Sequence, residues 1–192
     1  MITLIEDNVT HGYKIYRSDV IVKNQSQMIE KIYQSHKVLT EKYSMVTGFN
    51  GDTFNSTFLY RTYNTFALTG QSEHFYELYK DLLTLIKLNL RDKKYLWFQS
   101  WLNFHRPEQV LKWHNHAWPY HGYISLDPKK TQTVFRDYTI NNEVGNIYFG
   151  PGHREHKVEI LEPYDGHRIT LGFDVEYRPA PSNTLLSLIP IV

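Results

Sequence analysis

The spacing of the apolar residues changes at Tyr95, and this change constrains the fold more than any other feature of the chain. From there to Val175, apolar and polar residues alternate in short runs, which is the pattern of half-buried β-strands. Turn-forming pairs such as Asp127-Pro128 and Asp165-Gly166 separate the runs. About seven or eight short strands at this spacing predict a barrel or sandwich of the jelly-roll type.

The predicted strands cover residues 95–104, 110–113, 120–126, 131–135, 145–149, 156–161 and 167–175. The N-terminal half has a different pattern. Residues 13–22 alternate briefly, while residues 26–40 and 72–90 carry apolar side chains at helical spacing, with Asn24 or Ser26 and then Ser72 as caps. We therefore expect a mainly β fold with flanking helices that cover the outer face of the barrel.

A length of 192 residues suits a single domain. We expect residues 1–94 to form a helix-containing N-terminal support, residues 95–178 the β core and residues 179–192 a C-terminal tail. The apolar run at 185–192 either packs on this domain or seals a homodimer.

The charges of the chain nearly cancel, because 21 basic side chains face 20 acidic ones. No strong field therefore draws the protein to duplex nucleic acid or to a membrane surface. Cysteine is absent, so His, Asp or Glu must hold any metal ion. The N-terminus does not read as a signal peptide, and no apolar run is long enough to span a bilayer. We expect a cytoplasmic protein, in the host cytoplasm if the chain is viral.

Seven of the ten histidines lie between His105 and His167. In a strand, His114 and His116 would project to the same face, and His156 could join them from a neighbouring strand. Neutral imidazoles bind first-row divalent metals, and a facial set of three leaves positions open for substrate and oxygen. The spacing thus predicts a metal site, in which either both residues of the H-x-H coordinate or only one does.

An anion-binding residue follows twelve positions after His156. Arg168 has a planar guanidinium that can grip a carboxylate through two hydrogen bonds, and Thr170 lies on the same strand face. The alternative is a structural arginine that pairs with Asp174 or Glu159.

Taken together, these segments resemble the 2-oxoglutarate/Fe(II)-dependent oxygenase superfamily over about residues 97–175. The resemblance rests on Trp101-x-Asn103, His114-x-His116, the strands at 122–126 and 145–149, His156 and Arg168-x-Thr170. It is strongest to a bacterial and phage subgroup that carries W-x-N ahead of H-x-H. The resemblance implies a double-stranded β-helix, the jelly roll of cupin-like barrels.

The same resemblance implies a set of ligands and an activity. His114, His116 and His156 would hold Fe(II), and Arg168, helped by Thr170, would bind the distal carboxylate of 2-oxoglutarate. The implied reaction couples oxidative decarboxylation of 2-oxoglutarate to hydroxylation of a small-molecule or peptide substrate.

His116 departs from the usual motif of the superfamily, which has Asp or Glu at that position. Three-His sites occur in cupins, and Gly145-x5-Pro151 followed by His156 also resembles a second cupin motif. The alternative is therefore a cupin-like three-His metalloprotein, enzyme or binding module, that does not use 2-oxoglutarate. The Arg168-x-Thr170 pair favours the oxygenase, and an interaction module without metal is a third possibility.

Other residues near the site have weaker patterns. Asn103, with Gln99, is expected to line the pocket near the keto acid unless it lies on a polar outer face, and the hydroxyl of Tyr123 could reach 2-oxoglutarate or substrate unless it only packs. Trp113 and Trp118 are expected to exclude water from the ligands. Three histidines are expected outside the metal set, at the surface, in turns or as outer hydrogen-bond donors: His105, His153 and His167.

Overall fold

The computed structural model describes residues 1–42, 57, 62–91, 93, 95–177 and 187–191, and its strands form two antiparallel sheets. The larger sheet contains, in spatial order, β1 (Ile2–Asn8), β2 (Tyr13–Ser18), β7 (Asn146–Pro151), β4 (Tyr120–Asp127), β9 (Arg168–Glu176), β3 (Leu96–His105) and β10 (Ile189–Ile191). The smaller sheet contains β6 (Thr139–Asn141), β5 (Thr131–Phe135) and β8 (His156–Ile160).

Six strands of the β core match the predicted ranges to within a few residues, and the fold is the expected double-stranded β-helix. β4 lies between β7 and β9 in the large sheet, while β5 pairs with β8 in the small one. From β6 to β9, consecutive strands alternate between the small and the large sheet instead of forming one meander. This crossing brings residues that are distant in sequence to the space between the sheets.

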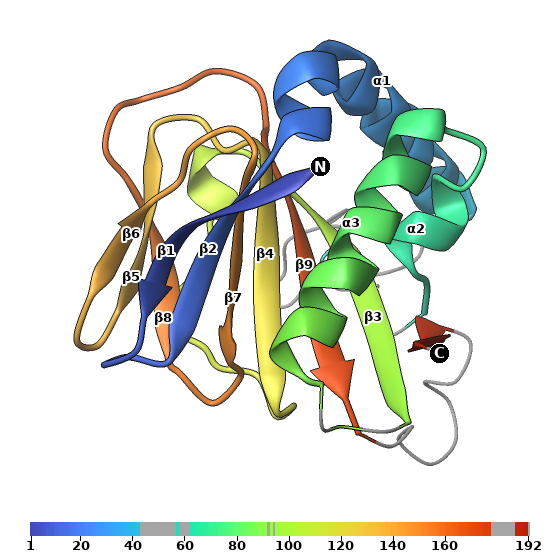
Figure 1. Ribbon diagram of the computed structural model, residues 1–192. Helices are drawn as coiled ribbons and strands as arrows, with labels where there is room; N and C mark the ends of the chain where they lie inside the picture. The colour runs from blue at the N-terminus through green and yellow to red at the C-terminus, as the bar shows by residue number, and fades with distance from the viewer. Residues whose placement is uncertain (43–56, 58–61, 92, 94, 178–186, 192) are drawn as a thin grey trace.

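Three helices flank the large sheet in the described part of the chain: α1 (Asp19–Lys42), α2 (Thr65–Leu68) and α3 (Glu73–Asn89). They gather on the side of β4, β9 and β3, away from the small sheet (Figure 1). α3 confirms the predicted 72–90 helix, with Ser72 at its N-cap position. α1 begins earlier than expected and shortens the predicted 13–22 strand, and non-helical angles at Asn24 divide it close to the predicted start at residue 26.

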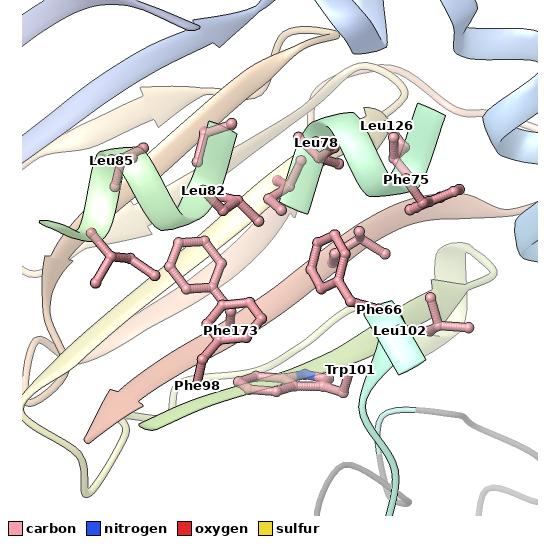
Figure 2. Packing of buried hydrophobic residues seen from close by; sticks show 14 of the residues in the cluster. Phe66, Phe75, Leu78, Leu82, Leu85, Phe98, Trp101, Leu102, Leu126 and Phe173 are labelled. Carbon is pink, nitrogen blue, oxygen red and sulfur yellow. The ribbon is translucent and has the colours of Figure 1, made fainter. Parts of the chain in front are cut away.

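The two-residue period of the strands gives the large sheet one apolar face, which the helices cover. Phe98 of β3 and Phe173 of β9 are fully buried, with ring centroids 5.7 Å apart. Leu78 and Leu82 of α3 reach down onto this layer, and Phe66 of α2 closes its side (Figure 2). Burial of this apolar surface holds the helices against the sheet.

The opposite face of the large sheet looks into the barrel and carries polar side chains. On β9 these are Arg168, Thr170 and Asp174, all nearly inaccessible to solvent and all part of one cavity wall. They alternate with Ile169, Leu171, Phe173 and Val175, which belong to the helix-covered core. Buried polar groups need hydrogen-bond partners, so a ligand bound against this inward face would supply partners to these side chains.

A second apolar cluster joins the two sheets inside the barrel. It contains Tyr13, Ile15, Tyr123, Phe135, Ile140 and Tyr148. The rings of Tyr123 and Tyr148 stack with centroids 5.1 Å apart, and Phe135 of the small sheet lies 5.2 Å from Tyr148. This packing holds the small sheet against the large one.

One predicted strand is absent from the described residues, and the described part of the apolar tail pairs with β3. The predicted strand at 110–113 is wrong, because that segment has one backbone hydrogen bond to β8, from the Val158 N–H to the Leu111 carbonyl, instead of a ladder. The described part of the apolar tail packs on the chain itself, since Ile189–Ile191 pairs with β3 at Leu96 to Phe98. Residues 185, 186 and 192 of that tail lie outside the described residues.

Among the helices described, none combines the length and hydrophobicity needed to cross a membrane.

The packing of α3 predicts that two of its leucines contribute very differently to the free energy of unfolding. Leu82 is fully buried, whereas Leu88 is 50% exposed on the same helix. We expect Leu82→Ala to lower the free energy of unfolding by about 2–5 kcal/mol, because it removes buried methyl groups and leaves a cavity. Leu88→Ala should change it by less than about 0.5 kcal/mol. Urea unfolding of both variants measures this, and equal effects would contradict the packing described.

Candidate functional site

His114 and His156 are brought together by backbone hydrogen bonds between distant segments. The His114 N–H donates to the His156 carbonyl at 2.9 Å, and the His156 N–H donates back at 2.8 Å. This isolated antiparallel bridge places the two imidazole centroids 4.3 Å apart. The His116 N–H then donates to the Gly152 carbonyl at 2.9 Å, which ties the H-x-H segment to the turn before β8.

Gly152 is required at that turn because the chain approaches it closely. A Cβ atom at Gly152 would lie 2.0 Å from the Trp118 carbonyl oxygen, well inside van der Waals contact. The absence of a side chain therefore lets the segment around His116 lie against the turn.

The three predicted ligands offer nitrogen atoms that all lie within 4.8 Å of one another. Nδ1 of His114 is 2.7 Å from the Lys112 carbonyl oxygen, and Nδ1 of His156 is 2.9 Å from the Arg154 carbonyl oxygen. Because a carbonyl only accepts, each Nδ1 carries the proton, and the lone pair remains on Nε2.

His116 is fixed in the same tautomer by a different partner. Its Nδ1 is 3.2 Å from the Asp174 carboxylate, while its Nε2 is buried and has no hydrogen-bond partner among the described residues. In each of the three imidazoles the partner on Nδ1 thus leaves the lone pair of Nε2 available for a metal ion. This is the usual arrangement of histidines around a bound transition metal.

Burial favours the neutral, metal-binding form of His114 and His156. It lowers the pKa of His114 and, more strongly, the pKa of His156, with the neighbouring histidines acting in the same direction. No proton therefore has to leave these two rings at neutral pH before a metal ion binds.

A second group of possible ligands overlaps the first: His116, His121 and Asp174 also lie within 4.8 Å of one another. The rings of His116 and His121, however, are stacked face to face, with centroids 3.6 Å apart and planes at 13°. A metal ion lies close to the plane of each imidazole that binds it, and two rings that overlap at 3.6 Å cannot both meet that condition for one ion. We therefore assign these contacts to hydrogen bonds around Asp174. The rings of His116 and His156 are also nearly parallel, at 10°, but their centroids are 5.5 Å apart, so this restriction does not apply to them.

The predicted anion-binding residue is fully enclosed and has no acidic partner. Arg168 is 2% exposed, and it donates from Nε to Thr131 Oγ1 and from NH1 to Thr170 Oγ1, both at 3.2 Å. No carboxylate of the described residues lies within 4.0 Å of it, because Asp174 binds the two histidines and Glu159 pairs with Lys157. The alternative drawn from the sequence, an ion pair of Arg168 with Asp174 or Glu159, is therefore not found among the described residues.

Burial lowers the pKa of Arg168 to about 10, so the guanidinium keeps its charge at neutral pH. A buried charge without a counter-ion is unfavourable, and the unused N–H groups add to that cost. An anionic ligand in the cavity would relieve both.

Thr170 and Asn103 extend the donor set. Thr170 Oγ1 accepts from Arg168 and, at 3.3 Å, from Asn103 Nδ2, so its own proton points elsewhere. Asn103 is held in turn by Trp101 Nε1 at 3.2 Å and by Thr57 Oγ1 at 2.8 Å. This network fixes the orientation of the threonine hydroxyl.

Tyr123 supplies a further donor. Its hydroxyl is buried without a well-formed hydrogen bond to any described residue, although Thr133 lies near it. Burial raises the pKa of Tyr123, so the group stays protonated. Among the described residues, this end of the site therefore offers more proton donors than acceptors.

All of these groups line one cavity of about 280 Å³. It is bordered by all seven residues expected to bind metal or 2-oxoglutarate: His114, His116, His156, Arg168, Thr170, Asn103 and Tyr123. Gln99, expected to line the pocket with Asn103, does not border it. The cavity is also bordered by residues that sequence reasoning did not place in the site: Thr57, Trp101, Leu111, Asn115, Ala117, His121, Thr133, Val158 and Asp174. Trp118 borders it as expected.

The sequence did not lead us to place His121 and Asp174 in the site, although the two-residue strand period predicts an inward position for both. His121 lies two residues before Tyr123 on β4, and Asp174 lies four residues after Thr170 on β9, so each shares the inward face of its strand. Their mutual hydrogen bond, 3.0 Å between His121 Nδ1 and Asp174 Oδ1, follows from the pairing of β4 with β9.

The expectations for His105 and Trp113 are wrong. His105 is fully buried opposite Arg168 in the β3–β9 pair, and its Nε2 lies 2.9 Å from Thr57 Oγ1. Trp113 faces away from the cavity, where the Arg136 guanidinium stacks on its ring at 3.9 Å. The remaining two histidines agree with expectation, since His153 is exposed and His167 lies in the turn before β9.

Comparisons with known proteins support the fold. No protein-family model matches the chain, and no curated protein matches it. Among solved structures, the non-heme alpha ketoglutarate dependent carbocyclase SnoK from nogalamycin biosynthesis is 11% identical, with a TM-score of 0.59 over 95% of this chain and 92% of that one.

Two further structures have similar scores. The epimerase SnoN in complex with Fe3+, alpha ketoglutarate and nogalamycin RO is 13% identical, with a TM-score of 0.56 over 95% of this chain and 91% of that one. A Pseudomonas putida prolyl-4-hydroxylase is 10% identical, with a TM-score of 0.56 over 88% and 94%. At such identities the likeness shows a shared double-stranded β-helix, the fold of these 2-oxoglutarate/Fe(II)-dependent oxygenases.

His105 makes the stability of the metal-free protein sensitive to acid. Burial, together with the charge of Arg168, lowers the pKa of His105 to about 3, whereas an unfolded histidine titrates near ~6.5. Below pH ~6.5 the unfolded state takes up a proton that the folded state does not. The free energy of unfolding therefore decreases as the pH is lowered from ~6.5 toward the pKa of the folded state. The contribution of one such group is up to about 1.4 kcal/mol per pH unit.

We expect His105→Gln to reduce that slope between about pH 6 and pH 4, because glutamine keeps a polar partner for Thr57 but does not titrate. Urea unfolding in the presence of a chelator, measured across this range, gives both slopes. A variant with the slope of the wild type would show that His105 is not neutral and enclosed as described.

Proposed function

We propose that this chain is a non-haem Fe(II) oxygenase that couples oxidative decarboxylation of 2-oxoglutarate to hydroxylation of a second substrate. The observation that carries the proposal is the joint presence, in one cavity, of three imidazoles with ligand nitrogens within 4.8 Å of one another and a buried arginine that has no carboxylate partner among the described residues. The first group requires a cation, and the second requires an anion.

The residues present fit an iron ion. His114, His116 and His156 would bind it through Nε2, the atom that the Nδ1 hydrogen bonds leave free in each ring. The buried Nε2 of His116 has no other partner among the described residues, so a metal ion would satisfy it. Imidazole is a good ligand for iron, and three ligands on one side leave coordination positions for co-substrate and oxygen.

The residues at the other end of the cavity fit the distal carboxylate of 2-oxoglutarate. The unused N–H groups of Arg168, the hydroxyl of Thr170 and the hydroxyl of Tyr123 are all donors. Asn103 orients Thr170 and so acts on the co-substrate indirectly. Charge-assisted hydrogen bonds of this kind give both affinity and a fixed orientation.

The chemistry itself would come from the cofactors. When bound, Fe(II) and 2-oxoglutarate supply an oxidant from dioxygen, with release of succinate and carbon dioxide. The chain's contribution is to orient both groups and to limit access of water, and Trp101 and Trp118 in the cavity wall suit that task. We propose a small molecule or peptide as the hydroxylated substrate and place the chain with the H-x-H subgroup.

The three-His ligand set favours one alternative, a cupin-like metalloprotein that does not use 2-oxoglutarate. The two functions differ in what Arg168 binds. An experiment on that residue therefore separates them.

We expect Arg168→Gln to weaken 2-oxoglutarate binding to the metal-loaded protein by at least about 30-fold, because a buried charged contact is lost. Metal affinity should change by less than about threefold, since Arg168 contacts none of the three histidines. Isothermal titration measures both, with Arg17→Gln on β2 as the control, because Arg17 is 44% exposed and pairs with Glu143. Equal loss of metal and 2-oxoglutarate would identify a structural arginine.

Anaerobic addition of Fe(II) and 2-oxoglutarate should produce a weak charge-transfer band in the visible spectrum of the wild type. Succinate release over a panel of metabolites and peptides would then identify the substrate class. Protein that binds Fe(II) but gives no band with 2-oxoglutarate would support the cupin-like alternative.

A further inference from the structure

Asp174 is a buried carboxylate whose ionic partners among the described residues are two imidazoles of the site, His116 and His121. It is 1% exposed, and its Oδ1 lies 3.2 Å from His116 Nδ1 and 3.0 Å from His121 Nδ1. Its Oδ2 is buried without a hydrogen-bond partner among the described residues. Both contacts on Oδ1 come from imidazole nitrogens, which can donate to a carboxylate oxygen.

Three histidine ligands would leave the positive charge of a divalent ion uncompensated, and the Asp174 carboxylate lies close enough to compensate part of it. Three neutral imidazoles leave the full double charge of a divalent ion in an enclosed cavity, where uncompensated charge is costly. A 2-His-1-carboxylate set removes one unit of that charge by direct coordination. Here the H-x-H segment supplies no carboxylate, and Asp174 is separated from the proposed metal position by the ring of His116.

The geometry excludes a direct bond from Asp174 Oδ1 to the same ion. Oδ1 meets His116 at Nδ1, whereas the metal would meet the ring at Nε2, on its other side. The carboxylate can still act through the ring, because a hydrogen bond at Nδ1 makes the nitrogen at the opposite side a better electron donor.

We propose that Asp174, held in place by His121, acts as an outer-sphere carboxylate that supplies the charge balance and ligand orientation which a coordinating carboxylate gives in 2-His-1-carboxylate sites. This role deepens the proposed function and rests on metal binding by His114, His116 and His156. It explains how a three-His set can serve a divalent iron site in this chain.

His121 and Trp101 are positioned to hold this arrangement rigidly. His121 donates to the same oxygen as His116 and stacks on its ring, so Oδ1 is fixed between the two Nδ1 atoms. The indole of Trp101 stacks near both rings, with centroids 5.7 Å from His116 and 6.1 Å from His121. Gly172, opposite Trp101 in the β3–β9 pair, makes room for it, because a Cβ there would lie 2.4 Å from the indole.

The test uses Co(II) alone, without 2-oxoglutarate or substrate. We expect Asp174→Asn, which keeps the shape and removes the charge, to weaken Co(II) binding by about 10- to 100-fold and to change the visible spectrum of the bound ion. The control is Asp137→Asn, because Asp137 is an exposed carboxylate that also pairs with a histidine, His11, outside the cavity. It should leave the Co(II) dissociation constant unchanged.

A double-mutant cycle separates charge balance from a structural effect. In a His116→Asp background the carboxylate enters the ligand set directly, so adding Asp174→Asn should cost less than about threefold in Co(II) affinity. Loss of the same size in both backgrounds would overturn the proposal, as would wild-type affinity in Asp174→Asn alone. If Asp174→Asn by itself does not fold, as judged by near-UV circular dichroism, the pair in the His116→Asp background decides in the same way.

These outcomes are distinct from failure of the proposed function. Wild-type protein that binds no Co(II) would remove the metal site itself. Wild-type protein that binds Co(II) and 2-oxoglutarate, with Asp174→Asn indistinguishable from it, would remove only the outer-sphere role.

Discussion

The structure depends on the unlike faces that strand parity gives to the large sheet. On β9, Ile169, Leu171 and Phe173 lie against the helix-covered core, while the residues between them look into the barrel. The apolar face secures the helices and therefore the register of the strands. Because the register is fixed, the inward side chains are held at set positions, and a shift by one residue would move Arg168 into the apolar core.

The cavity divides into two chemically opposite ends. At one end, imidazole nitrogens present lone pairs and Asp174 adds negative charge, so the environment suits a cation. At the other end, Arg168 has N–H groups beyond the two that bind Thr131 and Thr170, and the hydroxyls of Thr170 and Tyr123 have no hydrogen-bond acceptor identified in the described part of the chain. A ligand that chelates a metal ion and ends in a second carboxylate matches both ends. This complementarity is a stronger argument for 2-oxoglutarate than either end alone.

The contacts around the metal position also show how the chain limits motion at the site. Each candidate ligand has a second anchor, which is a backbone carbonyl for His114 and His156 and a carboxylate for His116. Such anchors fix ring orientation and tautomer before a metal ion arrives. The site is thus largely preorganised by hydrogen bonds that the fold itself makes.

Much of the site was predictable because its residues obey the two-residue strand period. Parity placed Arg168 with Thr170 on the inward face of β9, and both border the cavity. His114 and His116 border it as predicted, but their segment is not a strand, and Asn115 between them borders the cavity as well. The errors lie where periodicity carries no information. The segment at 110–113 has one backbone hydrogen bond to β8, from the Val158 N–H to the Leu111 carbonyl, instead of a ladder. His105 reads as a strand-end residue but is enclosed, because Arg168 and Thr57 cover it.

The sequence by itself determined the inward and outward faces of each strand, the helical stripe of α3 and the residue types available to bind a cation and an anion. Those properties are local, since they follow from backbone geometry and side-chain chemistry over a few residues. Only the tertiary structure decided which inward faces meet. The His114–His156 bridge and the β4–β9 pairing that brings His121 to Asp174 join residues about 40 or more positions apart, and hydrogen bonds between strands at such separations leave no trace in local spacing.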